Sequence, residues 1–205
     1  GQYFVKLPWR KDHPVLPNNY RMALGQLHSL RKGLLNIEGH LDIYNGIIKD
    51  QLKANFIEYV PDAKLTTHCH YLPHHCVAKD SVTTPLRVVY NCSARSGKGS
   101  PSLNDCLMTG PSMTEKLGDI LLKFRTNKYA YSADISKAFL RVCLHEEDRD
   151  WLRFLWFKNP HDPDSDIVTY RFSSVLFGST SSPFLLMATM DYHLKKSDSS
   201  LKDLI

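Results

Sequence analysis

The stretch that most constrains the fold is Tyr129–Ile135, which is followed by a short run that ends in Phe139. Its aromatic and small apolar residues predict a β-strand, and this strand would deliver the carboxylate of Asp134 at its tip. A carboxylate in that position can bind a divalent metal ion, because Mg²⁺ prefers hard oxygen ligands. Strands also end in Asp for reasons of turn geometry. Both interpretations stay open on this stretch alone.

Further blocks flank this stretch on both sides. Residues 71–79 read Tyr-Leu-Pro-His-His-Cys-Val-Ala-Lys, and residues 86–94 read Leu-Arg-Val-Val-Tyr-Asn-Cys-Ser-Ala. Residues 80–85 between them have the polar and Pro-containing composition of a hairpin tip. Downstream, residues 172–184 read Phe-Ser-Ser-Val-Leu-Phe-Gly-Ser-Thr-Ser-Ser-Pro-Phe. They predict a loop followed by a helix that begins near the proline.

In this order, the blocks resemble the polymerase motifs of retroelements, and in detail they are most similar to reverse transcriptases of BEL/Pao-type LTR retrotransposons. Residues 7–9 (Leu-Pro-Trp), 16–19 (Leu-Pro-Asn-Asn) and 102–105 (Ser-Leu-Asn-Asp) also fit this family. The resemblance implies an α+β fold: the fingers and an incomplete palm of a right-hand polymerase, with an antiparallel sheet, helices on one face and no thumb. It implies RNA-directed DNA polymerisation as the activity.

The resemblance also implies the site residues. Asp134 would bind catalytic Mg²⁺ together with the carbonyl of Ile135, in a transfer that uses two metal ions. The other predicted residues all contact nucleotide or nucleic acid. Those expected at the incoming deoxynucleotide are Lys79, Arg87, Phe139, Phe177 and Gly178, and those expected at the RNA/DNA template–primer are Asn104, Ser182 and Pro183.

Each of these residues has an ordinary alternative. Lys79 and Arg87 suit a triphosphate, because Arg presents a planar fork to phosphate and Lys a point charge, but both are also common on solvated strands. Phe139 would exclude a 2′-hydroxyl from the sugar site, or it is a core side chain. The Phe177-Gly178 pair would approach nucleotide closely, or it is a turn unrelated to nucleotide.

One expected motif is missing. The family carries an aromatic-x-Asp-Asp hairpin after the proline motif, which supplies the other metal-binding carboxylates, and this sequence contains no Asp-Asp pair. Asn91 also stands where relatives usually have Asp. We therefore expect the 205-residue chain to be a piece of a longer polyprotein, inactive by itself. The alternative is a decayed or co-opted element that binds nucleic acid or protein without catalysis.

Composition sets the remaining bounds. A chain of 205 residues with 42% hydrophobic content can bury one core or two lobes. No run is long and apolar enough to span a bilayer and no signal peptide is visible, so no membrane partner is expected. Five cysteines without a CxxC pair predict free thiols in a reducing compartment, either cytoplasm (including a virus-like particle) or nucleus. The net charge of +5 is compatible with nucleic acid.

Hydrophobic periodicity and turn signals predict the order of elements. In the first half of the chain, helices are expected over 20–35 and 41–56, followed by a strand hairpin within 68–100. A capping box at 112–115 predicts a further helix, with Leu117, Ile120, Leu121 and Phe124 toward a core. Hairpin arms are then expected at 151–157 and 167–172, and a last helix from Pro183 to Lys195. The expected regions are an irregular and helical part at 1–62, fingers at 63–100 and 142–181, and partial palm at 101–141 and 182–205.

Three polar clusters do not predict a metal site. Residues 68–76 hold four His and two Cys, but their spacing does not match a zinc finger or knuckle. The acids of residues 162–166 alternate with Pro and Ser, which is typical of a solvated loop. The charged run 145–150 is expected to be an exposed turn.

Overall fold

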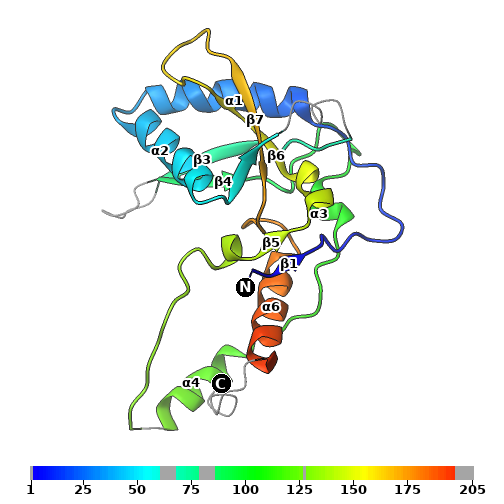
Figure 1. Ribbon diagram of the computed structural model, residues 1–205, viewed down its shortest axis with the longest axis vertical. Coiled ribbons are helices and arrows are strands. Elements are labelled where there is room, and N and C mark those ends of the chain that lie inside the picture. The colour runs from blue at the N-terminus through cyan, green and yellow to red at the C-terminus, as the bar shows by residue number, and fades with distance from the viewer. Residues whose placement is uncertain (1, 61–67, 79–85, 127, 197–205) are drawn as a thin grey trace.

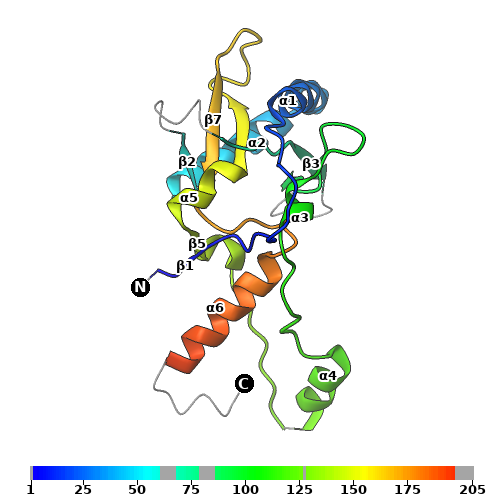
Figure 2. The same cartoon turned by 90° about the vertical axis from the view of Figure 1, so that its right-hand side faces the viewer.

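The computed structural model describes residues 2–60, 68–78, 86–126 and 128–196. The protein is a mixed helix and strand fold, elongated along one axis (Figure 1). One end holds helices α1 and α2 and most of the strands. Helices α6 and α4 extend away from this body toward the other end (Figure 2). The predicted α+β class is confirmed at this level.

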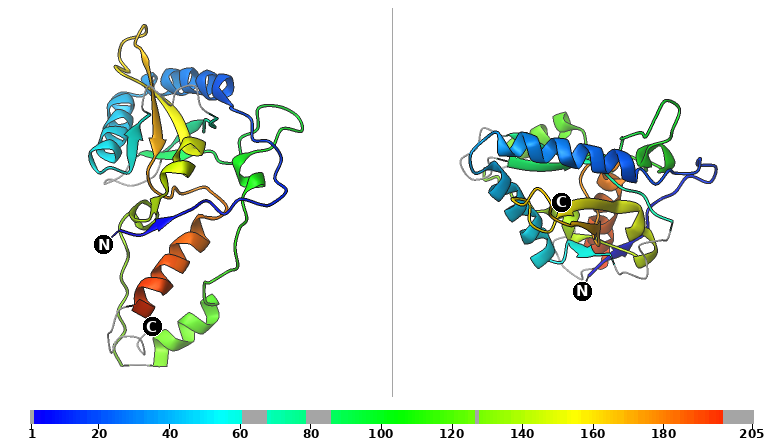
Figure 3. Two further views of the ribbon diagram at one scale, coloured as in Figure 1. Left: turned by 45° about the vertical axis from the view of Figure 1, so that its right-hand side comes forward. Right: turned by 90° about the horizontal axis from the view of Figure 1, so that it is seen from above.

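The two predicted N-terminal helices are present as α1 (Tyr20–Leu35) and α2 (His40–Lys53). Each buries one stripe, formed in α1 by Ala23, Leu27 and Leu34 and in α2 by Leu41, Tyr44 and Ile48. The chain reverses between them at Gly39, whose φ of 76° lies in the left-handed region that glycine adopts without cost. In Figure 3, α1 lies across the top of the strands.

A three-stranded antiparallel sheet forms the centre of the body. Its order is β2 (Ile57–Tyr59), β7 (Ile167–Phe172) and β6 (Arg153–Phe157), so the hairpin predicted for 151–157 and 167–172 is confirmed. Every residue of β6 is buried, because helices and the neighbouring hairpin cover it. The strand β2 falls in the region predicted as 1–62, yet it pairs with β7 in the sheet of 142–181.

The other predicted hairpin is present as β3 (His74–Ala78) and β4 (Leu86–Tyr90), paired antiparallel. Helix α1 packs on β3 and helix α2 packs on β4. The hairpin tip and Lys79 lie outside the described residues. A short parallel pair joins β1 (Phe4–Val5) to β5 (Cys143–Leu144), which ties the N-terminus to the middle of the chain.

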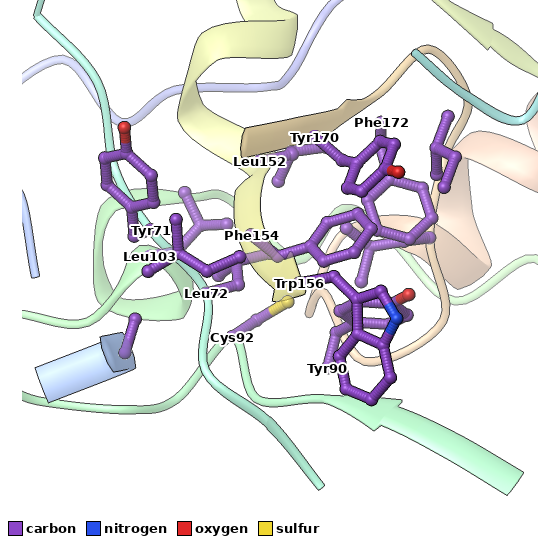
Figure 4. Close-up of a cluster of buried hydrophobic side chains, with 14 of the residues drawn as sticks. Tyr71, Leu72, Tyr90, Cys92, Leu103, Leu152, Phe154, Trp156, Tyr170 and Phe172 are labelled. Atoms are coloured by element: carbon purple, nitrogen blue, oxygen red, sulfur yellow. The ribbon is translucent and has the colours of Figure 1, made fainter. Parts of the chain in front are cut away.

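Aromatic rings fill the space between the sheet and the hairpin (Figure 4). The ring of Tyr90 lies 4.7 Å from Phe172 and 5.0 Å from Phe154, both edge to face. Edge-to-face pairs at this spacing add to the stabilisation that burial itself provides. Trp156 is 1% exposed and donates its indole N–H to Asn45 Oδ1. All five cysteines are free thiols, as predicted.

Short helices and turns complete the fold. They are α3 (Leu103–Cys106), α4 (Leu117–Thr126), the 3-10 turn η2 (Ala138–Arg141), α5 (Glu146–Arg149), the 3-10 turn η3 (Asp150–Leu152) and α6 (Ser182–Lys196). Helix α6 confirms the helix predicted from Pro183. No helix in the described part of the chain has both the length and the apolar character needed to cross a bilayer.

The strand predicted for Tyr129–Ile135 is wrong. Residues 129–135 form no strand, and all of them are exposed, with Tyr131 at 92%. A strand is stable only when its backbone N–H and C=O groups pair with a neighbour. No described strand lies beside this segment, so these residues do not form the strand that their composition favours. The described parts of 101–141 and 182–205 therefore contain no sheet.

The prediction for the helix after residue 112 is partly wrong. Helix α4 forms, but the Ser112 hydroxyl bonds Thr114 Oγ1 and Glu115 pairs with Lys123, so no capping box closes. No residue of α4 is buried. The apolar residues expected in a core are instead exposed: Leu117, Ile120, Leu121 and Phe124. The hydrophobic periodicity therefore predicted the helix correctly, but the expectation that its apolar side chains pack into a core was wrong.

The exposed turn predicted for 145–150 is partly wrong. Residues 145–147 are exposed, as predicted. Asp148 is buried, where its carboxylate accepts hydrogen bonds from Leu7 N at 2.8 Å and from the Trp9 indole at 3.1 Å. Asp150 accepts from two buried arginines of the sheet, Arg153 and Arg171. These two acids lie inside because they satisfy donors that the fold brings there. In contrast, the acids at 162, 164 and 166 are exposed, as predicted.

Arg171 has the most ion pairs of the described residues in this cluster. Its guanidinium lies 2.7 Å from Glu58, 2.6 Å from Glu146 and 3.1 Å from Asp150, and its side chain is 2% exposed. The three acids come from β2, α5 and η3. This network therefore joins the sheet to the segment that follows β5, and its role is structural.

Candidate functional site

The loop between β7 and α6 holds the predicted glycine, Gly178. Its φ is 111°, and a Cβ atom added there would lie 3.0 Å from the carbonyl oxygen of Tyr90. Both the conformation and the close approach require glycine. Gly178 thus allows the loop to pack directly against the end of β4, which is the strand that holds Arg87.

Asn104 fixes this loop from the other side. Its side-chain amide donates to Gly178 O at 3.1 Å and to Ser93 Oγ at 2.9 Å, while its Oδ1 accepts from Thr180 N at 2.9 Å. Both amide protons are therefore used within the fold. A contact of Asn104 with template–primer stays a prediction, and its observed contacts position the loop around Gly178.

Phe139 and Phe177 lie in contact although 37 residues separate them in sequence. Their ring centroids are 5.6 Å apart at an interplanar angle of 67°. Phe139 is half-buried on η2, whereas Phe177 is 69% exposed. The pair therefore has a ring face available to a ligand, which a fully buried core pair would lack. The sequence predicted both residues at one nucleotide, and the fold brings them together.

Arg87 lies on the same strand as Tyr90 but faces outward. Side chains alternate along a strand, so Leu86 and Tyr90 point inward and are buried, whereas Arg87 is exposed. Arg87 is paired in register with Val77. Its guanidinium is thus free of the core, and its Cα atom lies about 10 Å along the strand from that of Tyr90, which contacts Gly178. Lys79, expected on the other side of the hairpin tip, lies outside the described residues.

Asp134 and Ile135 lie in the exposed segment before η2. The Asp134 carboxylate forms no hydrogen bond or ion pair with another described residue. Phe139 follows it by five positions, so the two Cα atoms are at most about 18 Å apart. Within the described ranges, no three His, Cys, Asp or Glu side chains gather to hold a metal ion. These residues do not fit the ligand set of a two-magnesium centre, which needs further carboxylates.

Ser182 and Pro183 differ in exposure at the start of α6. Ser182 is buried, and its hydroxyl donates to Leu176 O at 2.7 Å. Pro183 is exposed as the second residue of the helix, where its missing N–H costs nothing. Of the two, only Pro183 presents its side chain to the outside. Ser182 closes the loop that holds Gly178.

Two basic residues beside Phe139 were not predicted as site residues. Lys137 Nζ lies 5.7 Å from the ring centre of Phe56, and Arg141 Cζ lies 5.6 Å from the same ring. Both side chains are exposed. Both cations therefore lie at the ring of Phe56, in the segment that contains Phe139. The signal in the sequence was their position, two residues before and after that aromatic residue.

The histidine cluster of residues 68–76 is engaged in the core. His74 Nε2 donates to Leu155 O at 2.9 Å, so the neutral ring accepts the Tyr44 hydroxyl at Nδ1, 2.5 Å away. His70 Nδ1 donates to Pro17 O at 2.6 Å. Burial lowers the pKa of both rings, that of His74 to about 4. A metal could bind His74 only by breaking these hydrogen bonds.

Comparison with known proteins adds no relative. No protein-family model matches the chain, and no curated protein gives a significant match.

Proposed function

We propose that the chain is part of an RNA-directed DNA polymerase of a retroelement, comprising the fingers and part of the palm. The observation that supports this most strongly is the contact between Phe139 and Phe177 beside Gly178. These residues come from two motifs that the family places at one nucleotide. The proposal accounts for the contact between these two distant positions, which supports it. The exposed ring of Phe177 leaves the pair open to a ligand.

In this proposal the residues act as a nucleotide site. Phe139 lies against the sugar of a deoxynucleoside triphosphate, and the ring of Phe177 packs on the same nucleotide. Lys137 and Arg141, which lie over the ring of Phe56, add positive charge to the segment that holds Phe139, and Arg87 approaches the phosphates as a planar donor. Template–primer lies along the loop of Gly178, and Asp134 supplies one ligand of the Mg²⁺ ions of the complete enzyme.

The nucleotide site can be tested on the chain itself. A photoreactive deoxynucleoside triphosphate should label the chain, and unlabelled deoxynucleotide should compete better than ribonucleotide. Phe139→Val should remove this sugar preference, because the smaller side chain leaves room for a 2′-hydroxyl. Phe124→Val, a change at an exposed ring of α4, is the matched control. Equal competition by both sugars in the unmodified chain would contradict the proposal.

Catalysis requires a separate test. We expect no primer extension by the purified chain, because the single carboxylate of Asp134 cannot hold two Mg²⁺ ions. In a longer protein with an aromatic-x-Asp-Asp hairpin, RNA-templated extension should appear, and Asp134→Ala should abolish it. Extension by the chain alone that is lost with Asp134→Ala would overturn the expectation of inactivity. A longer protein that binds template but never extends would overturn the polymerase proposal.

A non-catalytic binding module is the second candidate, favoured by helix α4. Its exposed apolar side chains, including Leu117 and Leu122, lack a covering surface among the described residues. Such a face is typical of protein contact. The polymerase proposal instead expects weak, sequence-tolerant nucleic-acid binding that falls with salt and does not rise with Arg87→Ala. Undetectable nucleic-acid binding at low salt would favour the protein-binding module.

A further inference from the structure

A second candidate site lies at the start of helix α1, on the body formed by the helices and the sheet. A hollow of about 790 Å³ opens there, and residues of the first turn, the preceding segment and three other parts of the chain line it. The lining includes Asn18, Asn19, Arg21, Tyr71 and Ser96, and none of its described residues is acidic. Both views of Figure 3 place the green loop that holds Ser96 beside the first turn of α1.

The first turn of α1 has free hydrogen-bond donors. The N–H of Tyr20 donates to Asn18 Oδ1 at 3.0 Å, and the N–H of Ala23 donates to Asn19 O at 3.0 Å. The N–H groups between them, at Arg21 and Met22, have no acceptor among the described residues. No acidic residue lies in this turn and no side chain of the N-cap residue caps it. A 16-residue helix also places a partial positive charge there.

Asn19 supplies an independent indication of a ligand. It lines the hollow, is 6% exposed, and neither its amide nitrogen nor its amide oxygen has a hydrogen-bond partner among the described residues. A buried amide without a partner is unfavourable, and native folds rarely retain one unless another molecule satisfies it. The φ of 62° explains why Asn is tolerated at this position, but it does not supply partners for the buried amide. The amide is therefore explained if a bound group accepts its N–H.

We propose that this hollow binds a phosphate group. The N–H groups of Arg21 and Met22 and the amide of Asn19 donate to the phosphate oxygens. The guanidinium of Arg21, which is exposed at the rim, adds a charged planar donor suited to phosphate. The phosphate belongs either to a free nucleotide or to the backbone of a nucleic-acid strand.

This site does not depend on the proposed polymerase function. It includes neither Asp134 nor Phe139 and needs no metal ion. Its binding can be measured without any reaction, in a buffer free of divalent cations. Failure here would leave the nucleotide site at Phe139 and Phe177 untouched, and failure of primer extension would leave this site untouched.

The direct test is an amide NMR titration of the ¹⁵N-labelled chain with inorganic phosphate, a deoxynucleoside monophosphate and a short oligothymidylate, each against chloride at matched ionic strength. The amide signals of Arg21 and Met22 should move downfield and saturate. Tightest binding by the oligothymidylate would identify a nucleic-acid strand as the source, and tightest binding by the monophosphate a free nucleotide. If none of the three moves these signals, the proposal is wrong.

Variants separate this site from general charge attraction. Asn19→Asp places a carboxylate where the phosphate would bind, so binding should weaken about tenfold or more, and the buried charge should also lower thermal stability. Asn19→Gly tolerates the φ of 62° and removes the amide, which provides a second variant should the first fail to fold. Unchanged affinity in both variants would overturn the site.

Charge reversal gives the matched control. Arg21→Glu should weaken phosphate binding about tenfold or more, because it replaces a charged donor with a like charge. Lys32→Glu makes the same change in net charge in the last turn of the same helix, where the side chain is exposed. It should leave binding nearly unchanged. Equal weakening by both variants would show that only overall charge attracts phosphate, and the proposal would fail.

Discussion

Acid should destabilise this protein through His74, whose ring is buried and neutral. Burial disfavours the imidazolium, and the nearby His75 acts in the same direction, so the pKa of His74 falls from 6.5 to about 4. In the unfolded chain the ring titrates near its ordinary value. Between these two pKa values the unfolded state binds the extra proton. The free energy of unfolding should therefore fall as the pH decreases from about 6.5 to about 4.

The size of the effect follows from the difference in pKa. Each pKa unit corresponds to about 1.4 kcal/mol, so a difference of about 2.5 gives a maximum of about 3 kcal/mol, reached near pH 4. Between pH 7.5 and pH 5 the same two pKa values give a loss of about 2 kcal/mol. This is a large fraction of the stability of an ordinary domain.

Urea unfolding at pH 7.5 and pH 5, followed by tryptophan fluorescence, measures this loss. Trp156 is a suitable reporter, because its ring lies 5.9 Å from that of His74. The control is His74→Gln, which keeps a polar side chain of similar reach but does not titrate. Burial also lowers the pKa of His70, and comparing the two proteins cancels that contribution.

We expect the loss between the two pH values to be about 2 kcal/mol smaller in His74→Gln than in the unmodified chain. The variant will be less stable at both pH values, so only the pH dependence decides the matter. If both proteins lose the same free energy of unfolding, His74 is not a buried neutral ring, and the assigned hydrogen bonds to Tyr44 and Leu155 are wrong.

Three further predictions concern stability and are checked by urea or thermal unfolding. Gly178→Ala should cost about 1–3 kcal/mol because of its φ and its contact with Tyr90 O, whereas Gly25→Ala, in open space within α1, should stabilise by about 0.5–1 kcal/mol; equal effects would remove the argument for a required glycine. Arg171→Ala should cost about 1–3 kcal/mol, since it removes a buried guanidinium and its charge-assisted hydrogen bonds, although Arg149 and Arg153 still pair with Glu58 and Asp150; a loss below about 1 kcal/mol would mean that the network is solvated. Leu121→Gln should change stability by less than about 0.5 kcal/mol, because the side chain is 48% exposed, and a large loss would show that α4 is covered.

The sequence by itself determined the local elements of this protein. Helices α1 and α2 follow from residues spaced to form one apolar stripe, and the β6–β7 hairpin follows from two apolar runs around a polar loop. Such patterns act over a few residues, so they can be recognised without knowledge of the rest of the chain. The exposure of the acids in residues 162–166 could also be predicted from the local sequence.

Tertiary structure decided which predicted elements acquire partners. Residues 129–135 have a strand-like composition, but a strand needs another strand beside it and none is described there. Helix α4 has exposed apolar side chains that no other described part of the chain covers. The charged run 145–150 looked solvated, yet Asp148 and Asp150 are held inside by donors from distant segments. A charged side chain is buried only when the fold supplies such partners, and these partners cannot be identified from the sequence because they lie far along the chain.

In the candidate site, too, the sequence identified single residues, and the tertiary structure decided which of them are in contact. Motifs in the sequence identified Phe139, Phe177 and Gly178 one by one, but only the fold shows the two rings 5.6 Å apart and the glycine against Tyr90 O. The role of Asn104 in fixing the loop, and the unpartnered amide of Asn19, have no signal in the sequence. A side chain's hydrogen-bond partners lie far along the chain, so whether it is satisfied becomes known only when the chain has folded.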